Sequence, residues 1–420
     1  MTERRLLWLA GTVAAATIGV GLGVRPFGHT MGTALSPFVM AWLPRVDPWA
    51  LPALGALALA AWAVPRVLRA RAFPAAVAAL AAVAGLAVSA LPLGPRGWDV
   101  VFDLGRSGSF EAKNEYLPGL GALHYGPHFF LDRFAELVPS LPINAGGHPP
   151  GLLLALDALG VTTAPRLAAL CVLAVAATAP LTYALAGALG AGEERARAAG
   201  VLAALSPALL LFGISSADAI YAALGTGAAA LLVSRRGRRA GVVVFAVATF
   251  ATWSLLAVGF FAAAVIWQRE GRRPALALAL ACGFAVLALD GGLALAAGYD
   301  PVATLRATSA LYDHSLARIR PYAFWWIGSP VAWAVMMGPP IAAAWLLAAR
   351  RGDPAARALV AVIVIAAVAG FTKAETERIW LPFVPLACAS AGSVVRIRPA
   401  LVGALAGQAV LVSLLFQTIW

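Results

Sequence analysis

Apolar stretches of about 15–24 residues recur along the whole chain, and short breaks rich in arginine, proline or glycine separate them. A helix needs about 20 apolar residues to cross a bilayer, and it satisfies its own backbone hydrogen bonds there. The pattern therefore predicts an all-α, polytopic transmembrane helical protein with about thirteen helices. The expected spans are 6–24, 49–65, 74–93, 167–189, 196–213, 217–234, 239–252, 254–268, 274–297, 328–348, 356–371, 380–395 and 399–417.

Two parts of this pattern leave alternatives open. The stretches 239–252 and 254–268 could form one long helix, and segment 28–44 is apolar enough to dip into the membrane. The first span also has the outline of a secretory signal peptide, but we interpret it as a retained helix. No repeat or low-complexity linker divides the chain, which predicts a single integral membrane domain over 1–420.

The composition supports the same class of protein. Hydrophobic residues make up 61% of the chain and charged residues only 12%, whereas soluble domains are nearer half apolar and a quarter charged. The net charge of +12 would suit a nucleic-acid partner, but the arginines cluster at helix ends, so we expect no nucleic acid. Cys171, Cys282 and Cys388 fall inside apolar runs without disulfide or metal spacing.

The distribution of charge predicts an orientation in the cell (plasma) membrane. If the N-terminus is cytoplasmic, the cytoplasmic breaks hold 19 of the 31 lysines and arginines but only five of the 19 acids, as the positive-inside rule expects. The long outer loops are then 94–166 and 298–327, with the short loop 371–379 beside them. Polar chemistry is therefore expected at the extracytoplasmic face.

The first outer loop carries an ordered series of polar and aromatic residues. Val100, Val101 and Phe102 precede Asp103 directly after a predicted span, Tyr116 follows, and His148-Pro149-Pro150 opens a short amphipathic helix expected at 151–160. This order resembles the GT-C superfamily of membrane glycosyltransferases. It is most similar to the branch of protein O-mannosyltransferases and aminoarabinose transferases, which use polyprenyl-phosphate sugars.

The resemblance covers roughly residues 95–395 and has two departures. The branch opens its loop with an Asp-Glu pair, but Leu104 stands where the glutamate would be, and about twenty residues are inserted before His148. Asp218 and Arg378 match charged positions that the family has at outer helix ends. The resemblance implies a GT-C-like core over 74–395. It does not explain the extra N-terminal helices expected over 1–73, and a C-terminal helix is expected over 396–420.

A sugar on a polyprenyl phosphate is presented at headgroup depth, because its tail is anchored in the bilayer. Its transfer to a hydroxyl requires a base, which a carboxylate supplies, and cations for the departing phosphate, which arginine grips with two donors. Attack opposite the phosphate inverts the anomeric carbon. We expect Asp103 to be the base; the alternative is a helix or turn cap on a solvated loop.

The other candidates also have a functional and a structural interpretation. Acids and a tyrosine near Asp103 could supply the second acid or bind the acceptor, or could form caps and a solvated face; they are Asp99, Glu111, Glu115 and Tyr116. Arg378 and Lys373 are the candidates for the donor phosphate, with a structural ion-pair cluster as the alternative. The residues expected to line the site are His148, Asp218, His314, Arg320 and Glu377. Asp290 lies within an apolar span, where a carboxylate is costly.

These features together predict an inverting integral membrane glycosyltransferase. Its partners would be membrane lipid, a polyprenyl-phosphate sugar donor and a glycan, lipid or protein acceptor. No cofactor is certain, and a divalent cation stays open although no histidine or acid spacing supports a metal site. The alternatives are a transporter or flippase of lipid-linked sugars and a non-catalytic GT-C relative, which Leu104 makes plausible.

Overall fold

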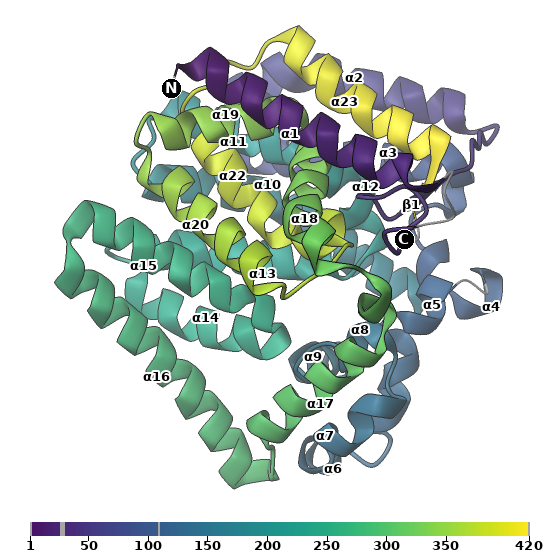
Figure 1. The fold of residues 1–420 in the computed structure, drawn as a ribbon, viewed down its shortest axis with the longest axis vertical. Coiled ribbons are helices and arrows are strands. Elements are labelled where there is room, and N and C mark those ends of the chain that lie inside the picture. The colour runs from purple at the N-terminus through teal and green to yellow at the C-terminus, as the bar shows by residue number, and fades with distance from the viewer. Residues whose placement is uncertain (1, 26–29, 108–109, 419–420) are drawn as a thin grey trace.

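Helices form nearly all of the regular structure of this protein (Figure 1). The computed structural model describes residues 2–25, 30–107 and 110–418. Among these residues, five helices are long and apolar enough to cross a membrane: α1 (Glu3–Gly23), α2 (Ala50–Arg69), α3 (Phe73–Leu93), α10 (Ala164–Ala188) and α16 (Arg272–Ala297). The prediction of an all-α, multi-pass membrane protein is confirmed at this level.

Two further spans would be bent pairs of helices. The pair α11 (Glu193–Leu205) and α12 (Pro207–Ser215) bends by 53°, and the pair α18 (Tyr322–Met337) and α19 (Pro339–Arg350) bends by 112°. A proline begins the second helix of each pair, where its missing N–H and fixed φ interrupt the helix. Counting both pairs gives up to seven candidate spans among the described residues.

Shorter helices lie over the remaining predicted spans, so the number thirteen stays a prediction. They are α13 (Asp218–Val233), α14 (Arg238–Ala251), α15 (Leu256–Glu270), α20 (Pro354–Ala369), α22 (Val384–Ala391) and α23 (Pro399–Leu415). The 3₁₀ turn η6 (Trp253–Leu255) separates α14 from α15, so the stretch 239–268 forms two helices and not one. Within segment 28–44, the described residues 30–44 form turns and the strand β1 (Met40–Trp42), which pairs antiparallel with β2 (Phe416–Thr418).

The connections that were predicted to be outer loops fold into short helices. In the first loop these are η2 (Gly94–Arg96), η3 (Val100–Phe102), α4 (Leu104–Ser107), α5 (Phe110–Asn114), η4 (Leu117–Leu123), α6 (Pro127–Asp132), α7 (Phe134–Leu137), η5 (Val138–Ser140), α8 (Ile143–Gly146) and α9 (Gly151–Ala158). The later loops contain α17 (Pro301–His314), η7 (Leu316–Ile319), α21 (Thr376–Ile379) and η8 (Leu381–Phe383). The short helix that His148-Pro149-Pro150 predicts is present as α9.

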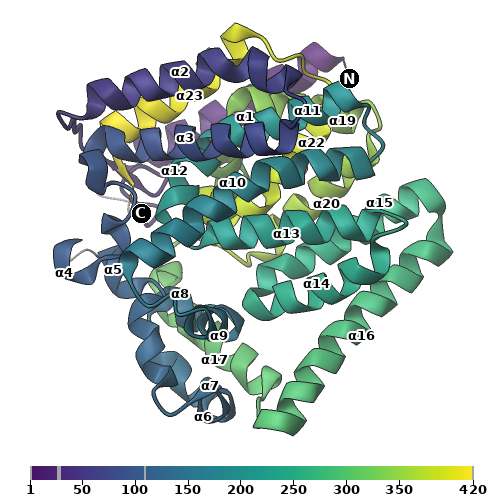
Figure 2. The ribbon, with the colours of Figure 1, turned by 180° about the vertical axis from the view of Figure 1, so that it is seen from behind.

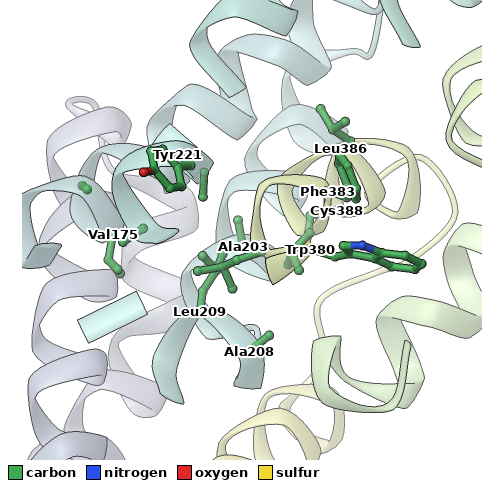
Figure 3. Close-up of a cluster of buried hydrophobic side chains, with 14 of the residues drawn as sticks. Val175, Ala203, Ala208, Leu209, Tyr221, Trp380, Phe383, Leu386 and Cys388 are labelled. Atoms are coloured by element: carbon green, nitrogen blue, oxygen red, sulfur yellow. The ribbon is translucent and has the colours of Figure 1, made fainter. Parts of the chain in front are cut away.

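The helical bundle is organised around α10. This helix packs against α3, α11, α13 and α22, and Figure 2 shows α10 and α13 lying side by side. Small and aromatic side chains fill the space between them, and Figure 3 draws one such cluster, in which Val175, Tyr221 and Trp380 come from three separate segments. The core therefore includes Trp380, which is two positions beyond Arg378.

Loops that the charge pattern assigns to one side of the membrane meet at one end of the bundle. At the predicted cytoplasmic end, Arg351 forms an ion pair with Glu3 at 2.8 Å, and Arg197 donates to the carbonyl of Leu68 at 2.9 Å. Basic turns far apart in sequence are thus neighbours in space.

The predicted outer loops meet in the same way. The indole of Trp325 donates to the carbonyl of Met31 at 2.8 Å, and the hydroxyl of Thr308 donates to the carbonyl of Gly146 at 3.1 Å. In Figure 1, α17 runs toward the group formed by α7, α8 and α9, and α17 contacts α7 and α8. These contacts fit helices that cross in alternation, whereas which end faces the cytoplasm stays a prediction.

Candidate functional site

A buried ion pair forms the centre of the candidate site. Arg378 on α21 donates from Nη1 to Oδ2 of Asp218 at 2.5 Å, and both side chains are at most 7% exposed. The hydroxyl of Ser216 also donates to this Asp218 oxygen at 2.6 Å. Asp218 is the first residue of α13, where the helix dipole favours a negative charge. The candidate site therefore lies at the N-terminus of α13, where loop 371–379 contacts this helix.

A second arginine is joined to this pair through Glu375. Arg320, which follows η7, donates from Nη2 to Oε1 of Glu375 at 2.9 Å, and Arg378 lies 3.4 Å from Oε2 of the same carboxylate. Arg320 also donates from Nη1 to the carbonyl of Lys373 at 2.8 Å. Glu375 and Ala374 both have left-handed backbones, with φ of 60° and 68°. Loop 371–379 is thus held in a strained conformation by two guanidinium groups.

Glu115 enters the cluster from the first outer loop. Its Oε1 accepts a hydrogen bond from the amide of Asn144 at 3.0 Å, and its Oε2 is buried without a hydrogen-bond partner among the described residues. Burial raises the pKa of Glu115 to about 7; nearby Arg378 opposes the rise, while Asp218 adds to it. The interpretation of Glu115 as part of a solvated face is therefore wrong.

Two tyrosines and a histidine close the cluster on the side of α13. The hydroxyls of Tyr116 and Tyr221 share a hydrogen bond of 2.6 Å, and the His148 ring lies edge-to-face against Tyr221 with 5.3 Å between ring centroids. The hydroxyl of Thr252 lies 3.1 Å from Nδ1 of His148. Burial lowers the pKa of His148 to about 4, so its imidazole is neutral at pH 7.

Glu377 connects the cluster to the N-terminal part of the chain. Its side chain is fully buried, and Oε1 accepts the backbone N–H of Val39 at 2.6 Å. Oε2 has no hydrogen-bond partner among the described residues, and burial raises the pKa of Glu377 to about 7. The segment that precedes α2, which the resemblance did not explain, is therefore in contact with loop 371–379.

Asp103 lies in a separate cluster with Asp99 and Arg106. Arg106 forms ion pairs with both carboxylates, at 2.5 Å to Asp103. Asp103 also accepts the backbone N–H of Arg106 at 3.0 Å, which is the role of a helix cap at α4. These hydrogen bonds from Arg106 lower the pKa of Asp103. The cap interpretation thus describes what Asp103 does in this structure, and Asp99 is its partner through Arg106.

Asp103 also lines an open pocket of about 390 Å³. Leu117 and Pro118 form part of this pocket, and they directly follow Glu115 and Tyr116, which point into the buried cluster. Leu117 and Pro118 therefore border the Asp103 pocket, whereas the two residues before them in sequence belong to the buried cluster.

The remaining predicted residues lie differently. The His314 side chain is exposed, and its Nδ1 lies 2.7 Å from the carbonyl of Ala310 on its own helix. Lys373 contributes through its backbone, because its N–H donates to the hydroxyl of Tyr312. Glu111 is half-buried on α5. Within the described ranges, no three His, Cys, Asp or Glu side chains are grouped so that they could hold a metal ion.

The sequence did not single out Asn144, Tyr221 or Arg106, nor Glu375 as a separate site residue. Tyr221 is three residues after Asp218, so the spacing of one helical turn could have placed both on one face of α13. Asn144 offers no such signal, because it meets Glu115 only through the fold of the first outer loop.

Comparison with known proteins finds similarity to a solved structure, but not to a family model or a curated sequence. The chain matches no protein-family model and no curated protein sequence. Among solved structures, the crystal structure of the Archaeoglobus fulgidus oligosaccharyltransferase in complex with Zn and sulfate is similar, with a TM-score of 0.45 and 14% sequence identity. The match covers 80% of this chain and 50% of that one, so this chain spans about half the length of that protein.

Proposed function

We propose that this protein is an integral membrane glycosyltransferase of the GT-C type. It would move a sugar from a polyprenyl-phosphate donor to a lipid, glycan or protein acceptor at the extracytoplasmic face. The observation that carries the proposal is the pair of buried arginines, Arg320 and Arg378, at the end of the bundle where the predicted outer loops meet. Buried guanidinium groups suit a phosphate, because each offers two parallel donors to its oxygens.

The charge states of the cluster are those of a functional site. Asp218 and Glu375 neutralise Arg378 and Arg320, while Glu115 and Glu377 have pKa values raised to about 7 and are partly protonated at neutral pH. Such perturbed carboxyl groups next to fixed charges are typical of functional sites. In a purely structural ion-pair network, we would expect each buried carboxyl group to have hydrogen-bond donors for both of its oxygens, which Glu115 and Glu377 lack among the described residues.

We assign the role of base to Asp103 because its side chain is accessible and ionised. It is 27% exposed, and the Arg106 hydrogen bonds keep its carboxylate deprotonated at neutral pH. The acceptor hydroxyl would lose its proton to Asp103 while its oxygen forms the bond to C1 of the sugar. The C1–O bond to phosphate breaks, and the electron pair leaves with the lipid phosphate, which Arg378 and Arg320 hold. The sugar carbon is inverted, and atoms and charges balance.

Glu115 is the second carboxyl group of the proposal, in place of the glutamate for which Leu104 stands. It is buried next to Tyr116 and hydrogen-bonded to Asn144, so we assign it to acceptor binding and not to the proton transfer. Because its pKa is raised to about 7, it can donate or accept a hydrogen bond at neutral pH.

The test is transfer of radiolabelled sugar from a panel of polyprenyl-phosphate sugars to lipid, glycan and protein fractions, with the full chain in membrane vesicles. We expect Asp103→Asn to abolish most transfer and Glu115→Gln to weaken acceptor use. Glu136→Gln is the matched control, because Glu136 is 69% exposed on the same loop and pairs only with its neighbour Arg133 among its described ion pairs.

Three outcomes would change the assignment. Full transfer by Asp103→Asn together with loss in Glu115→Gln would move the base to Glu115. Movement of the lipid-linked sugar across the vesicle membrane without transfer would favour a transporter or flippase. No transfer by the wild-type protein with any donor would favour a non-catalytic relative.

A further inference from the structure

The Glu375 carboxylate lies between the two buried arginines in the way that a ligand anion would. One carboxylate oxygen accepts from Arg320 at 2.9 Å, and the other lies 3.4 Å from Arg378. The arginine side chains are 5% and 7% exposed, whereas the Glu375 side chain is 21% exposed. The carboxylate therefore covers the two guanidinium groups from the more open side.

The hydrogen bonds around this carboxylate are incomplete. The Arg378 contact of 3.4 Å is long for a charge-assisted hydrogen bond, which is usually about 2.7–2.9 Å. The Nε–H of Arg320 is buried and has no acceptor among the described residues. An anion with more oxygens than a carboxylate could shorten the first contact and satisfy the second donor.

The backbone at this position is held against its own preference. Ala374 and Glu375 are consecutive non-glycine residues with φ of 68° and 60°. Residues that carry a Cβ atom disfavour this left-handed region. Arg320 holds the loop at two points, the Lys373 carbonyl and the Glu375 carboxylate. If another anion took these donors, the loop would be free to return to an ordinary conformation.

We propose that Glu375 is an internal substitute for the phosphate group of a ligand, and that a phosphate ester binds by displacing it from Arg320 and Arg378. The proposal rests on the proposed function only for the kind of ester, a lipid phosphate. A phosphodiester carries one negative charge, as the carboxylate does, so the exchange leaves the charge of the buried site unchanged. Its two ester oxygens, in addition to its two free oxygens, give it the further acceptors that the carboxylate lacks. Asp218 stays on Arg378 throughout, and Glu375 is released toward solvent.

The exchange also gives Glu375 a role in ligand release. After transfer, the remaining lipid phosphate is a monoester with a second ionisable oxygen, and it must leave before another donor binds. The return of the tethered carboxylate to Arg320 and Arg378 competes with that phosphate. Glu375 thus determines how tightly the site holds phosphate without touching the sugar.

The test is binding of geranyl phosphate, a short water-soluble isoprenyl phosphate, to the full chain in nanodiscs by calorimetry. Removal of the competing charge in Glu375→Gln should tighten binding about tenfold or more, because hydrogen bonds to charged groups are strong. Glu375→Ala should act in the same direction. Arg320→Gln added to Glu375→Gln should remove the gain, and Glu136→Gln should leave affinity unchanged.

Inorganic phosphate, measured in parallel, distinguishes a lipid phosphate from a free one, because only the former gains from an isoprenyl tail. Equal affinity for both would make free phosphate the ligand. Weaker binding by Glu375→Gln and Glu375→Ala than by the wild-type protein would overturn the proposal, as would binding of neither probe by any variant.

A measurement on the wild-type protein covers the case that the variants fail to fold. Geranyl phosphate should increase amide hydrogen exchange in peptides that contain Ala374 and Glu375, because the strained loop is released. Increased protection of these amides would contradict displacement. Neither readout involves sugar transfer, so failure of the glycosyltransferase proposal and failure of this one are separate results.

Discussion

The ion pair of Arg378 and Asp218 provides the sharpest test of the site. Both side chains are at most 7% exposed, and the two residues are 160 positions apart in sequence. Removal of one partner of a buried pair typically costs about 3–5 kcal/mol, because the other charge is left without compensation. We expect the lower end, about 3 kcal/mol, for Asp218→Asn and for Arg378→Gln. The reason is that Ser216 still donates to Asp218 in Arg378→Gln, and Glu375 still lies near Arg378 in Asp218→Asn.

The double variant should lose less stability than the sum of the single variants. With both charges removed, no uncompensated charge remains, so we expect a coupling energy of about 2 kcal/mol. The assay is unfolding of the purified protein in mixed micelles by titration with dodecyl sulfate, followed by tryptophan fluorescence. Trp380 is a useful reporter, because it is 3% exposed and two residues from Arg378.

The surface pair of Arg133 and Glu136 is the matched control for this cycle. Its side chains are 51% and 69% exposed, and such pairs contribute about 0.5 kcal/mol or less. Additive losses for Arg378 and Asp218, within about 0.5 kcal/mol, would refute a direct buried pair. A folded double variant that transfers no sugar would separate the phosphate-binding role of Arg378 from its structural role.

Three further predictions concern other parts of the site. Because the pKa of Glu377 is raised, its contribution to stability is full below its usual pKa of 4.5 and is lost as pH rises toward and through about 7. Glu377→Gln should therefore flatten the decline of the melting temperature between about pH 5 and 8, and an unchanged slope would contradict burial of this carboxyl group. Asp103→Asn should lower the rate of sugar transfer about 100-fold or more without changing the melting temperature, because asparagine caps a helix as well as aspartate does. A lower melting temperature together with the loss of transfer would point to a structural role only. Gly32→Ala should destabilise the protein by about 2 kcal/mol, because φ is +85° and the new Cβ would lie 2.6 Å from Cγ of Arg320. The control is Gly403→Ala, whose new Cβ meets open space and should not destabilise the protein. Equal melting temperatures for the two variants would contradict the close packing of Gly32.

The burial and contacts of the acidic residues in the first outer loop cannot be derived from the sequence. Glu111 and Glu115 look alike in sequence, four residues apart in a polar loop, yet Glu115 is 2% exposed while Glu111 is only half-buried. Asp103 was predicted as a site residue from its position, and its contacts with Arg106 add a capping role. Neither distinction can be derived from residue type, because both depend on how the loop helices pack.

The sequence by itself determined the class of this protein, its order of apolar helices and the two groups of loops at their ends. Hydropathy and proline placement act within one helix length, so a local pattern is enough to predict them. Only the tertiary structure decided which charges meet. Arg378 pairs with Asp218, Tyr116 with Tyr221 and Glu377 with Val39 across 105 to 338 residues of chain, and such pairings follow from the packing of many helices at once.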